Sequence, residues 1–270
     1  QPQNPVSNSL IPKVIVEAST GISAIDDGIK TLYRTGYLHN HLRMYVASLA
    51  CNIGQSAWNL PARWMYYHLL DGDWASNALS WQWVAGSNSH KKYYANQDNI
   101  NKYCYTQQKD TFLDVAYDEF KELKTPEVLL ELDTPSLKTS LPQRSDIVID
   151  PMLPSCIYNW YNLDPLWKGD LQANRILLLE PSHFKAYPIS AKSLDFMLSL
   201  SQNIQGIQCY VGEFKELVSH YSLEHIHYKE HPLNTHYHGN ETPRDWMFEV
   251  KGYYPSFFGF WKACRKTLNY

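Results

Sequence analysis

The sequence predicts two successive units of different class, an all-helical unit and a parallel-sheet α/β unit, together an α + α/β fold. Three observations support this prediction. Apolar residues recur at helical spacing up to about residue 125. Runs typical of strands then alternate with runs typical of helices from about residue 155. Between the two regions, prolines interrupt the chain at positions 126, 135, 142, 151 and 154.

The first part of the chain is expected to be an extended arm over residues 1–19, which carry three prolines, followed by a helical region over 20–125. The first predicted helix begins near Ile22 and ends at Gly36, because isoleucines and leucines recur there every three or four residues. The remaining helices are expected at 39–53, from Pro61 to the Asp71-Gly72-Asp73 turn, and at 112–123, with a loop after Trp83.

A proline-rich linker is expected at 126–154 and the α/β unit at 155–270. Strands are predicted at 175–180, 207–211 and 225–229, with helices at 193–203 and 213–221 between them. Strands that alternate with helices at this spacing predict a parallel sheet with crossover helices, a three-layer α/β domain. Because the chain contains no GxGxxG motif, a dinucleotide fingerprint is not expected.

Composition excludes several classes of protein. The formal charge of −3 argues against a surface coated in basic patches, although a local cationic groove for nucleic acid remains compatible with it. The five cysteines are scattered and form no CxxC motif, which favours reduced thiols in a cytoplasmic protein over a disulfide framework or a metal cluster. No apolar run reaches the length of a membrane span, so no membrane is expected as a partner.

The most distinctive stretch is WNLPARWMYYHLLDGDWASNALSWQW, from Trp58 to Trp83. The carboxylates of Asp71 and Asp73 flank a glycine at a predicted bend, where they would accept hydrogen bonds from hydroxyl or N–H groups of a ligand. Tryptophans on either side offer flat surfaces on which a ring can stack. Aromatic helices more often fill a protein core, and that interpretation stays open from spacing alone.

Three segments carry a resemblance to the DNA photolyase/cryptochrome family: TGISAIDDGIKTLYRTGYLHNHLRM, Trp58, and LLDGDWASNALSWQW. They resemble the FAD-binding helical domain of that family, which implies a photolyase-type half-domain here. The region after about residue 145 resembles the carboxy-terminal part of photolyase-related proteins of Bacteroidetes-type bacteria, in which a sheet domain follows the helical one.

The resemblance implies FAD as the cofactor and assigns it a set of contacts. Asp71 and Asp73 would accept hydrogen bonds from the flavin ring and from ribityl or ribose hydroxyls, and Asn77 would face the flavin N5. Arg43 would pair with Asp71 and fix its charge. The full set of implied cofactor-binding residues is Asn40, Arg43, Asp71, Gly72, Asp73 and Asn77.

The resemblance also implies positions that contact DNA. Asn40 and Met44 match positions that face the lesion in cyclobutane-dimer enzymes, and Trp83 would stack beside a flipped-out pyrimidine dimer. His41 stands where the family commonly has an arginine that contacts a DNA phosphate, which puts that contact in doubt. Trp81 and Trp58 match the first two members of an electron relay to the flavin, and the third position falls on Pro5.

The function implied is blue-light-driven, FAD-dependent repair of cyclobutane pyrimidine dimers in DNA, a lyase reaction. A cryptochrome-like flavin photoreceptor without repair activity is the alternative, and a fragment that binds no ligand is a third reading. Relative to the family, the chain lacks the amino-terminal half of the helical domain. We therefore expect it to act as the carboxy-terminal part of a longer or two-chain protein, and to bind flavin weakly or not at all when alone.

Two further features of the α/β region invite a functional reading. An antenna chromophore would be compatible with the family, and Asp164, Trp167 and Asp170 are the residues that we would place beside it. The segment 225–238 is rich in histidine and suggests metal binding. Because no cysteine lies near it, and Pro232 and Gly239 indicate a loop, we favour hydrogen-bonded or solvated histidines and assign no metal site.

Overall fold

The computed structural model describes residues 3–88 and 91–268. These residues form two compact units, and the units are not continuous in sequence. The first contains the chain up to Arg144 together with Leu179–Asn203, and the second contains Ser145–Leu178 and the chain from Ile204 onward. The predicted combination of a helical unit with a parallel-sheet unit is confirmed.

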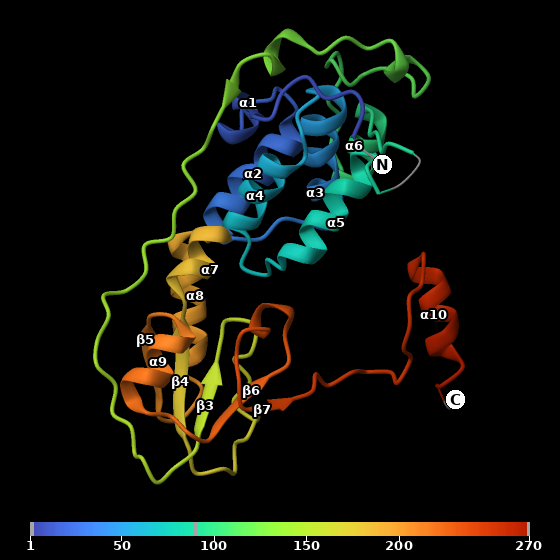
Figure 1. Cartoon of the computed structure of the whole chain (residues 1–270). Helices are drawn as coiled ribbons and strands as arrows, with labels where there is room; N and C mark the ends of the chain where they lie inside the picture. Colours follow the sequence, from blue (N-terminus) through green and yellow to red (C-terminus); the bar gives the residue numbers. More distant parts are fainter. Residues whose placement is uncertain (1–2, 89–90, 269–270) are drawn as a thin grey trace. The chain divides into compact units, whose positions relative to one another are not determined.

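Helices packed around one apolar core make up the first unit (Figure 1). Isoleucines and leucines spaced three or four residues apart place one face of α2 in that core. Helix α3 continues directly into a π-helical segment, every residue of which is buried. The α-helices before the sheet are α1 (Lys13–Val16), α2 (Ser23–Thr35), α3 (Asn40–Ser48, with the π-helical segment Leu49–Ile53), α4 (Asn59–His68), α5 (Trp74–Val84) and α6 (Gln97–Cys104).

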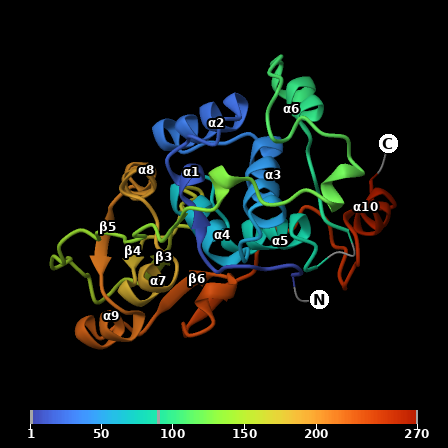
Figure 2. The same cartoon turned by 90° about the horizontal axis from the view of Figure 1, so that it is seen from above.

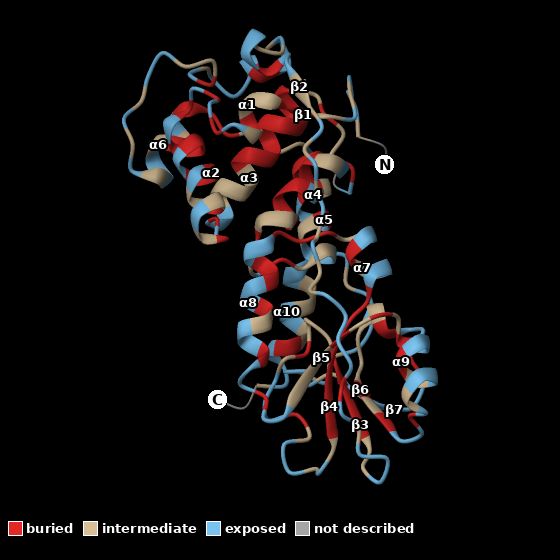
Figure 3. Ribbon diagram, turned by 90° about the vertical axis from the view of Figure 1, so that its left-hand side faces the viewer, coloured by how far each residue is buried: buried red, intermediate tan, exposed pale blue. Residues whose placement is uncertain are grey.

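The first residues of the chain contribute to the helical unit. Strand β1 (Ile11–Pro12) pairs antiparallel with β2 (Leu132–Asp133), and α1 follows β1 directly. The side chains of Ile11 and Ile15 are fully buried in the core that also contains α2 and α3. Figure 3 colours the buried residues of the chain red. The segment expected to be an extended arm therefore fixes part of this core.

Two local predictions between Trp83 and the prolines were wrong. Residues 97–104 form α6, whose first turn is capped by the Asn96 side chain accepting from the Asn99 amide at 3.1 Å. Within 112–123, expected to be helical, the structure has only the 3₁₀ turn Glu119–Lys121. Side chains bind the backbone there instead, as Asp114 does with the Asp110 amide at 2.9 Å, and such bonds compete with a helix.

The second unit contains a five-stranded sheet in the order β5–β4–β3–β6–β7 within the described residues. Figure 2 shows β5, β4, β3 and β6 side by side in that order. Strand β3 pairs in parallel with β4 and β6, and β6 pairs in parallel with β7. The strands are β3 (Ser155–Tyr158), β4 (Asn174–Leu179), β5 (Ile207–Val211), β6 (Ile226–Lys229) and β7 (Asn240–Thr242).

One face of the sheet packs against α9 (Phe214–Tyr221), whose Phe214 and Leu217 share an apolar cluster with Ile157 and Ile176. Arg175 is also buried, and its partners among the described residues are a hydroxyl and backbone carbonyls. Its guanidinium donates to the Tyr158 hydroxyl at 2.6 Å and to the Lys168 carbonyl at 2.6 Å. These bonds satisfy a charge that would otherwise be costly to bury.

The crossover between β4 and β5 consists of α7 (Pro181–Ala186) and α8 (Ala191–Ser201). Contacts assign both helices to the helical unit. A final helix, α10 (Phe257–Arg265), follows β7 after a long segment without regular structure. None of the helices in the described ranges has the length and apolar character that a bilayer crossing requires.

Candidate functional site

The acidic turn predicted from the sequence lies between α4 and α5. Leu69 leaves α4 in an extended conformation, and Asp73 caps α5 by accepting from the Ser76 amide at 2.7 Å. Between them, the Leu70 amide donates to the Gly36 carbonyl at 2.9 Å. Gly36 ends α2 with a φ of +74°, and a Cβ there would lie 2.5 Å from Leu70 Cγ. A glycine is therefore required for α2 and the turn to meet.

The Arg43–Asp71 pair expected from the sequence is present. Arg43 Nη2 lies 2.9 Å from both carboxylate oxygens of Asp71, and Arg43 Nε donates to the Leu38 carbonyl at 2.7 Å. The Arg43 side chain is 24% exposed and that of Asp71 is 58% exposed. The pair thus holds the carboxylate at the tip of the turn and leaves it accessible from solvent.

Gly72, predicted to lie beside the cofactor, is buried against the end of α4. A Cβ at this position would lie 3.3 Å from the Leu69 carbonyl oxygen and 3.3 Å from the Tyr66 ring. The absence of a side chain therefore lets the turn fold back onto α4. This packing is a structural reason for the glycine that holds with or without a ligand.

Asn77 lies on the first turns of α5, and its amide has a defined orientation. Its Nδ2 donates to the Ala62 carbonyl of α4 at 2.8 Å. Since a carbonyl oxygen accepts only from a donor, the nitrogen must face Ala62 and Oδ1 must face away from it. Among the described residues no group donates to Oδ1. The side chain can therefore accept one hydrogen bond from an N–H group of a ligand.

Helix α5 exposes an apolar stripe. Leu79 is 55% exposed and Trp83 is 46% exposed, and Ala75, Ser76 and Ser80 share this face. The Trp83 ring lies 5.7 Å from the Tyr93 ring, with an interplanar angle of 34°. Large apolar side chains that lie together on the exposed face of a helix are typical of an interaction surface. The outer face of α5 is thus suited to contact with a further surface.

The two tryptophans expected to form an electron relay differ in burial. Trp81 is 1% exposed and belongs to the core of the helical unit, and Trp58 is partly buried against that same core. Pro5, at the third relay position, is exposed and carries no ring that could transfer charge. The structure thus places two of the three positions on one core.

The expected DNA-facing residues lie on the first turns of α3. Asn40 is exposed, and its Nδ2 lies 3.9 Å from the sulfur of Met44. His41 packs in a group of rings, 4.9 Å from Tyr103 and 5.3 Å from His39. The imidazole at position 41 thus contacts neighbouring rings.

Helices α7 and α8 hold the far side of the acidic turn, which the sequence did not indicate. The Ser190 amide donates to the Tyr67 carbonyl at 2.8 Å, and the Ser193 hydroxyl donates to the Leu69 carbonyl at 3.3 Å. Both serines are buried. Residues more than a hundred positions beyond α4 therefore fix the point where the turn begins.

An arginine adds to this contact. Arg63 donates from Nη1 to the Ala186 carbonyl at 3.0 Å, and its guanidinium carbon lies 5.6 Å from the centre of the Trp74 ring. The same guanidinium lies 6.0 Å from the Tyr187 ring, in the range of a cation–π contact. Trp74, directly after Asp73, is thereby held between α4 and α7.

A buried aromatic group surrounds His68 at the end of α4. Its ring lies 4.7 Å from Tyr33 and 4.9 Å from Tyr67, measured between centroids. The Trp64 indole donates to the Tyr33 hydroxyl at 3.1 Å, which donates to the Val16 carbonyl at 2.6 Å. Burial lowers the pKa of His68 to about 4 and raises that of Tyr33 to about 12. Both side chains are therefore neutral at pH 7.

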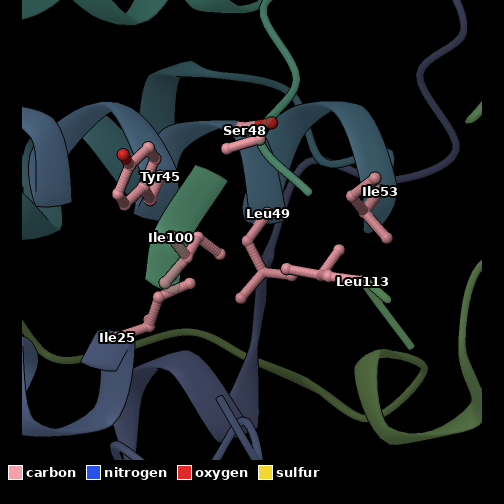
Figure 4. A pocket seen from close by; sticks show the side chains of 8 residues that line it. Ile25, Tyr45, Ser48, Leu49, Ile53, Ile100 and Leu113 are labelled. Atoms are coloured by element: carbon pink, nitrogen blue, oxygen red, sulfur yellow. The ribbon is translucent and has the colours of Figure 1, made fainter. Parts of the chain in front are cut away.

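Neither of two cavities in the helical unit is lined by the predicted site residues. Figure 4 shows the first, a void too small for a water molecule, where Ile100 of α6 packs beside Ile25 and Leu49. The second is an open polar groove of about 440 Å³ beside the start of α6, lined by Asn96, Asp98, Asn99, Lys102, Ala116 and Tyr117. We infer that a ligand bound to the acidic turn would be exposed to solvent on one side.

In the α/β unit, Trp167 is buried, with its ring edge-on to Tyr158 at 4.9 Å. Asp164 accepts from the Leu166 amide at 2.8 Å and thereby caps its own loop. The histidine-rich segment places His231 against Tyr161 with nearly parallel rings 4.4 Å apart. Within residues 3–88 and 91–268, no three metal-ligating side chains converge.

Comparison with known proteins identifies the helical part. Residues 13–125 match the model of the FAD binding domain of DNA photolyase. The match includes the acidic turn, Arg43, Asn77 and the tryptophans of α4 and α5. It supports FAD as the cofactor of the family to which this region is similar. No solved structure matches the chain.

Curated relatives match parts of the chain. A deoxyribodipyrimidine photo-lyase of Agrobacterium fabrum is 40% identical over 75 residues, 28% of this chain and 16% of the relative. Cryptochrome-1 of Arabidopsis thaliana is 31% identical over 83 residues, 31% of this chain and 12% of the relative. A putative mitochondrial cryptochrome DASH of Neurospora crassa is 31% identical over 140 residues, 50% of this chain and 19% of the relative. The chain spans less than a fifth of the length of each.

Proposed function

Since residues 13–125 place this chain in the photolyase/cryptochrome family, we propose that it takes part in blue-light-driven, FAD-dependent repair of cyclobutane pyrimidine dimers in DNA. The observation that carries the proposal is the fixed geometry of the acidic turn, with Asp71 held by Arg43 and Asn77 held by Ala62. These are the residues to which the family resemblance assigns the flavin.

The arrangement fits a flavin in its hydrogen-bonding chemistry. The carboxylate of Asp71 and the Oδ2 atom of Asp73, which does not cap α5, can accept hydrogen bonds from N–H and hydroxyl groups of the flavin. Asn77 Oδ1 can accept a hydrogen bond from a flavin N–H such as N5–H. Arg43 holds the Asp71 carboxylate in place through both oxygens and leaves its outer side accessible to solvent. When bound, reduced FAD would supply an electron to the dimer under blue light and would take it back after the cyclobutane ring has split. The reaction would therefore be redox-neutral overall.

The chain's own residues would bind the lesion and supply charge to the site. Because the reactive face of a dimer is hidden in the DNA stack, the lesion must be flipped out. The half-exposed Trp83 is proposed to stack beside it and to offset the unstacking cost by about 1–3 kcal/mol. Asn40 and Met44 are proposed to face the lesion, and His41 to lie near the DNA backbone. Trp81 and Trp58 are proposed to carry electrons through the core.

We propose further that a second helical segment, on the same precursor or on a separate chain, completes the flavin pocket. The apolar stripe of Leu79 and Trp83 supports this, because a matching helix would remove it from water. Flavin affinity of this chain alone is accordingly expected to be weak.

A repair assay tests the proposal. An oligonucleotide with one thymine dimer is incubated with the protein and reduced FAD under anaerobic conditions, and restored thymines are measured by chromatography after blue light and after darkness. We expect light-dependent restoration that falls at least tenfold in Asn77→Ala and in Trp83→Ala. Wild-type rates in both variants would show that the site is wrongly assigned.

A cryptochrome-like photoreceptor is the second candidate, supported by the similarity to cryptochrome-1 and to the DASH cryptochrome. Affinity for damaged DNA in the dark separates the two functions. A repair enzyme must prefer the dimer-containing duplex over the intact one, because it binds the flipped lesion. Equal affinity for the two duplexes would favour the photoreceptor.

A further inference from the structure

Aromatic side chains near the carboxy-terminal end are unusually exposed. Tyr253 is 90% exposed, Phe257 67% and Phe258 80%, while Trp261 is 36% exposed. The last three lie on α10 (red in Figure 1), which begins at Phe257 and is capped by Ser256. Several large aromatic rings exposed close together are typical of an interaction surface.

The same segment is strongly basic. From residue 251 onward the sequence contains Lys251, Lys262, Arg265 and Lys266 and no aspartate or glutamate, in a chain whose formal charge is −3. The three cations at 262, 265 and 266 are exposed. None of these three forms an ion pair with any residue in the described parts of the chain. They are therefore available to an anionic partner.

Helical spacing brings the rings and the cations onto one surface. Phe258, Trp261, Lys262 and Arg265 follow at i, i+3, i+4 and i+7, so they lie on one face of α10. The rings of Phe257 and Trp261 are nearly parallel, with an interplanar angle of 7° and centroids 6.4 Å apart. Flat rings and positive charges thus share one stripe of α10, with the rings nearer its amino-terminal end and the cations nearer its carboxy-terminal end.

We propose that residues 251–268, the aromatic–basic segment, bind single-stranded nucleic acid, with the rings of α10 stacking on bases and its cations contacting phosphates. Proteins that hold single strands combine these two features. A helix lying on a bilayer separates them, with its aromatic residues on one face and its cations on the other. The shared stripe on α10 therefore favours a nucleic acid over a membrane.

This binding goes beyond the proposed repair function and does not depend on it. It requires no flavin, no light and no lesion, and it uses none of the residues of the acidic turn. Failure of the repair assay would leave it standing, and its own failure would leave the flavin site untouched.

The test is a titration of fluorescein-labelled oligo-dT of about 20 nucleotides with the full chain, in the dark and without FAD, followed by anisotropy between 50 and 200 mM salt. The first variant is Lys262→Gln/Arg265→Gln/Lys266→Gln. Each phosphate contact on a single strand contributes about 0.7 to the slope of log affinity against log salt. We expect at least tenfold weaker binding at 50 mM salt and a slope smaller by about 2.

The matched control changes the same charge elsewhere. Lys121, Lys124 and Lys215 are exposed and lie outside the aromatic–basic segment. The variant Lys121→Gln/Lys124→Gln/Lys215→Gln is expected to bind oligo-dT within twofold of the wild type. An equal loss in this control would overturn the proposal, because the oligonucleotide would then sense only the net charge of the protein.

A second variant separates stacking from charge. Phe258→Ser/Trp261→Ala keeps all cations, so we expect roughly tenfold weaker binding with an unchanged salt slope. Circular dichroism of each variant checks that the chain remains folded, which we expect because all substituted residues are exposed. Two results would overturn the proposal: no binding of oligo-dT by the wild type, or binding to phosphatidylserine vesicles but not to oligo-dT.

Discussion

Asn77 of α5 donates its side-chain amide to the backbone carbonyl of Ala62 in α4, at 2.8 Å. This bond sets which end of the amide faces outward, so the orientation expected beside a flavin N5 is fixed by protein contacts. It also makes α4 and α5 neighbours at the point where the acidic turn joins them. Replacing the amide should therefore affect the fold as well as the site.

Asn77→Asp should destabilise the protein at pH 7. The carboxylate has no N–H to donate, so an acceptor would face the Ala62 carbonyl oxygen, and we expect a loss of about 1–3 kcal/mol in the free energy of unfolding. Urea denaturation followed by circular dichroism measures it. Asn59→Asp, at the exposed first residue of α4, is the control and should cause no loss. An equally small effect in both variants would contradict the fixed amide.

Arg43 and Asp71 should be energetically coupled. A double-mutant cycle with Arg43→Ala and Asp71→Ala is expected to give about 0.5–1 kcal/mol at low salt, because the arginine is only 24% exposed and contacts both oxygens. The coupling should shrink in 1 M salt. The Asp27–Lys30 pair, at 3.9 Å and largely exposed, is the comparison and should show no measurable coupling. No coupling between Arg43 and Asp71 at low salt would refute the prediction.

Ser193→Ala should loosen the acidic turn. Loss of the buried hydroxyl leaves the Leu69 carbonyl without this donor and should cost about 1–2 kcal/mol of stability. Hydrogen exchange at the Leu70 amide, which donates to Gly36, should become faster. Ser199→Ala, exposed on the same helix, is the control and should leave exchange unchanged. Equal exchange in both variants would mean that α8 does not hold the turn.

His68 should make stability fall in mild acid. Its pKa is lowered from 6.5 to about 4 in the folded state, so the unfolded chain binds the proton first as the pH drops. The free energy of unfolding therefore has its full value above pH 6.5 and decreases by about 2–3 kcal/mol as the pH falls towards 4. Urea denaturation at pH 7.5 and pH 4.5 measures the difference. This difference in the free energy of unfolding should be smaller in His68→Phe. It should be unchanged in His220→Gln, because His220 is exposed in the wild type.

Local patterns in the sequence were sufficient for much of the fold. The strand predicted at 207–211 is β5 with the same bounds, and the glycine predicted to end the first helix is the left-handed cap of α2. Apolar periodicity is set by burial of one face, which is why these elements could be predicted. The Arg43–Asp71 pair was expected from the family resemblance and is present.

Other features depend on contacts that no local pattern encodes. The bond from Ser193 to Leu69 joins residues 124 positions apart, and serine in a helix carries no signal of such a partner. For the same reason, no local pattern indicated that α7 and α8 belong to the helical unit. Helix α6 was missed because it is short and polar, and Ile100 is its one buried apolar residue.

The most direct test of the flavin site is a fluorescence titration of FAD with the full chain and with Asp71→Asn, up to 1 mM protein. We expect the wild type to quench FAD fluorescence weakly but saturably, and the affinity for FAD to be at least tenfold lower in Asp71→Asn. The same affinity in both proteins would contradict the proposal that the carboxylate of Asp71 contacts the flavin.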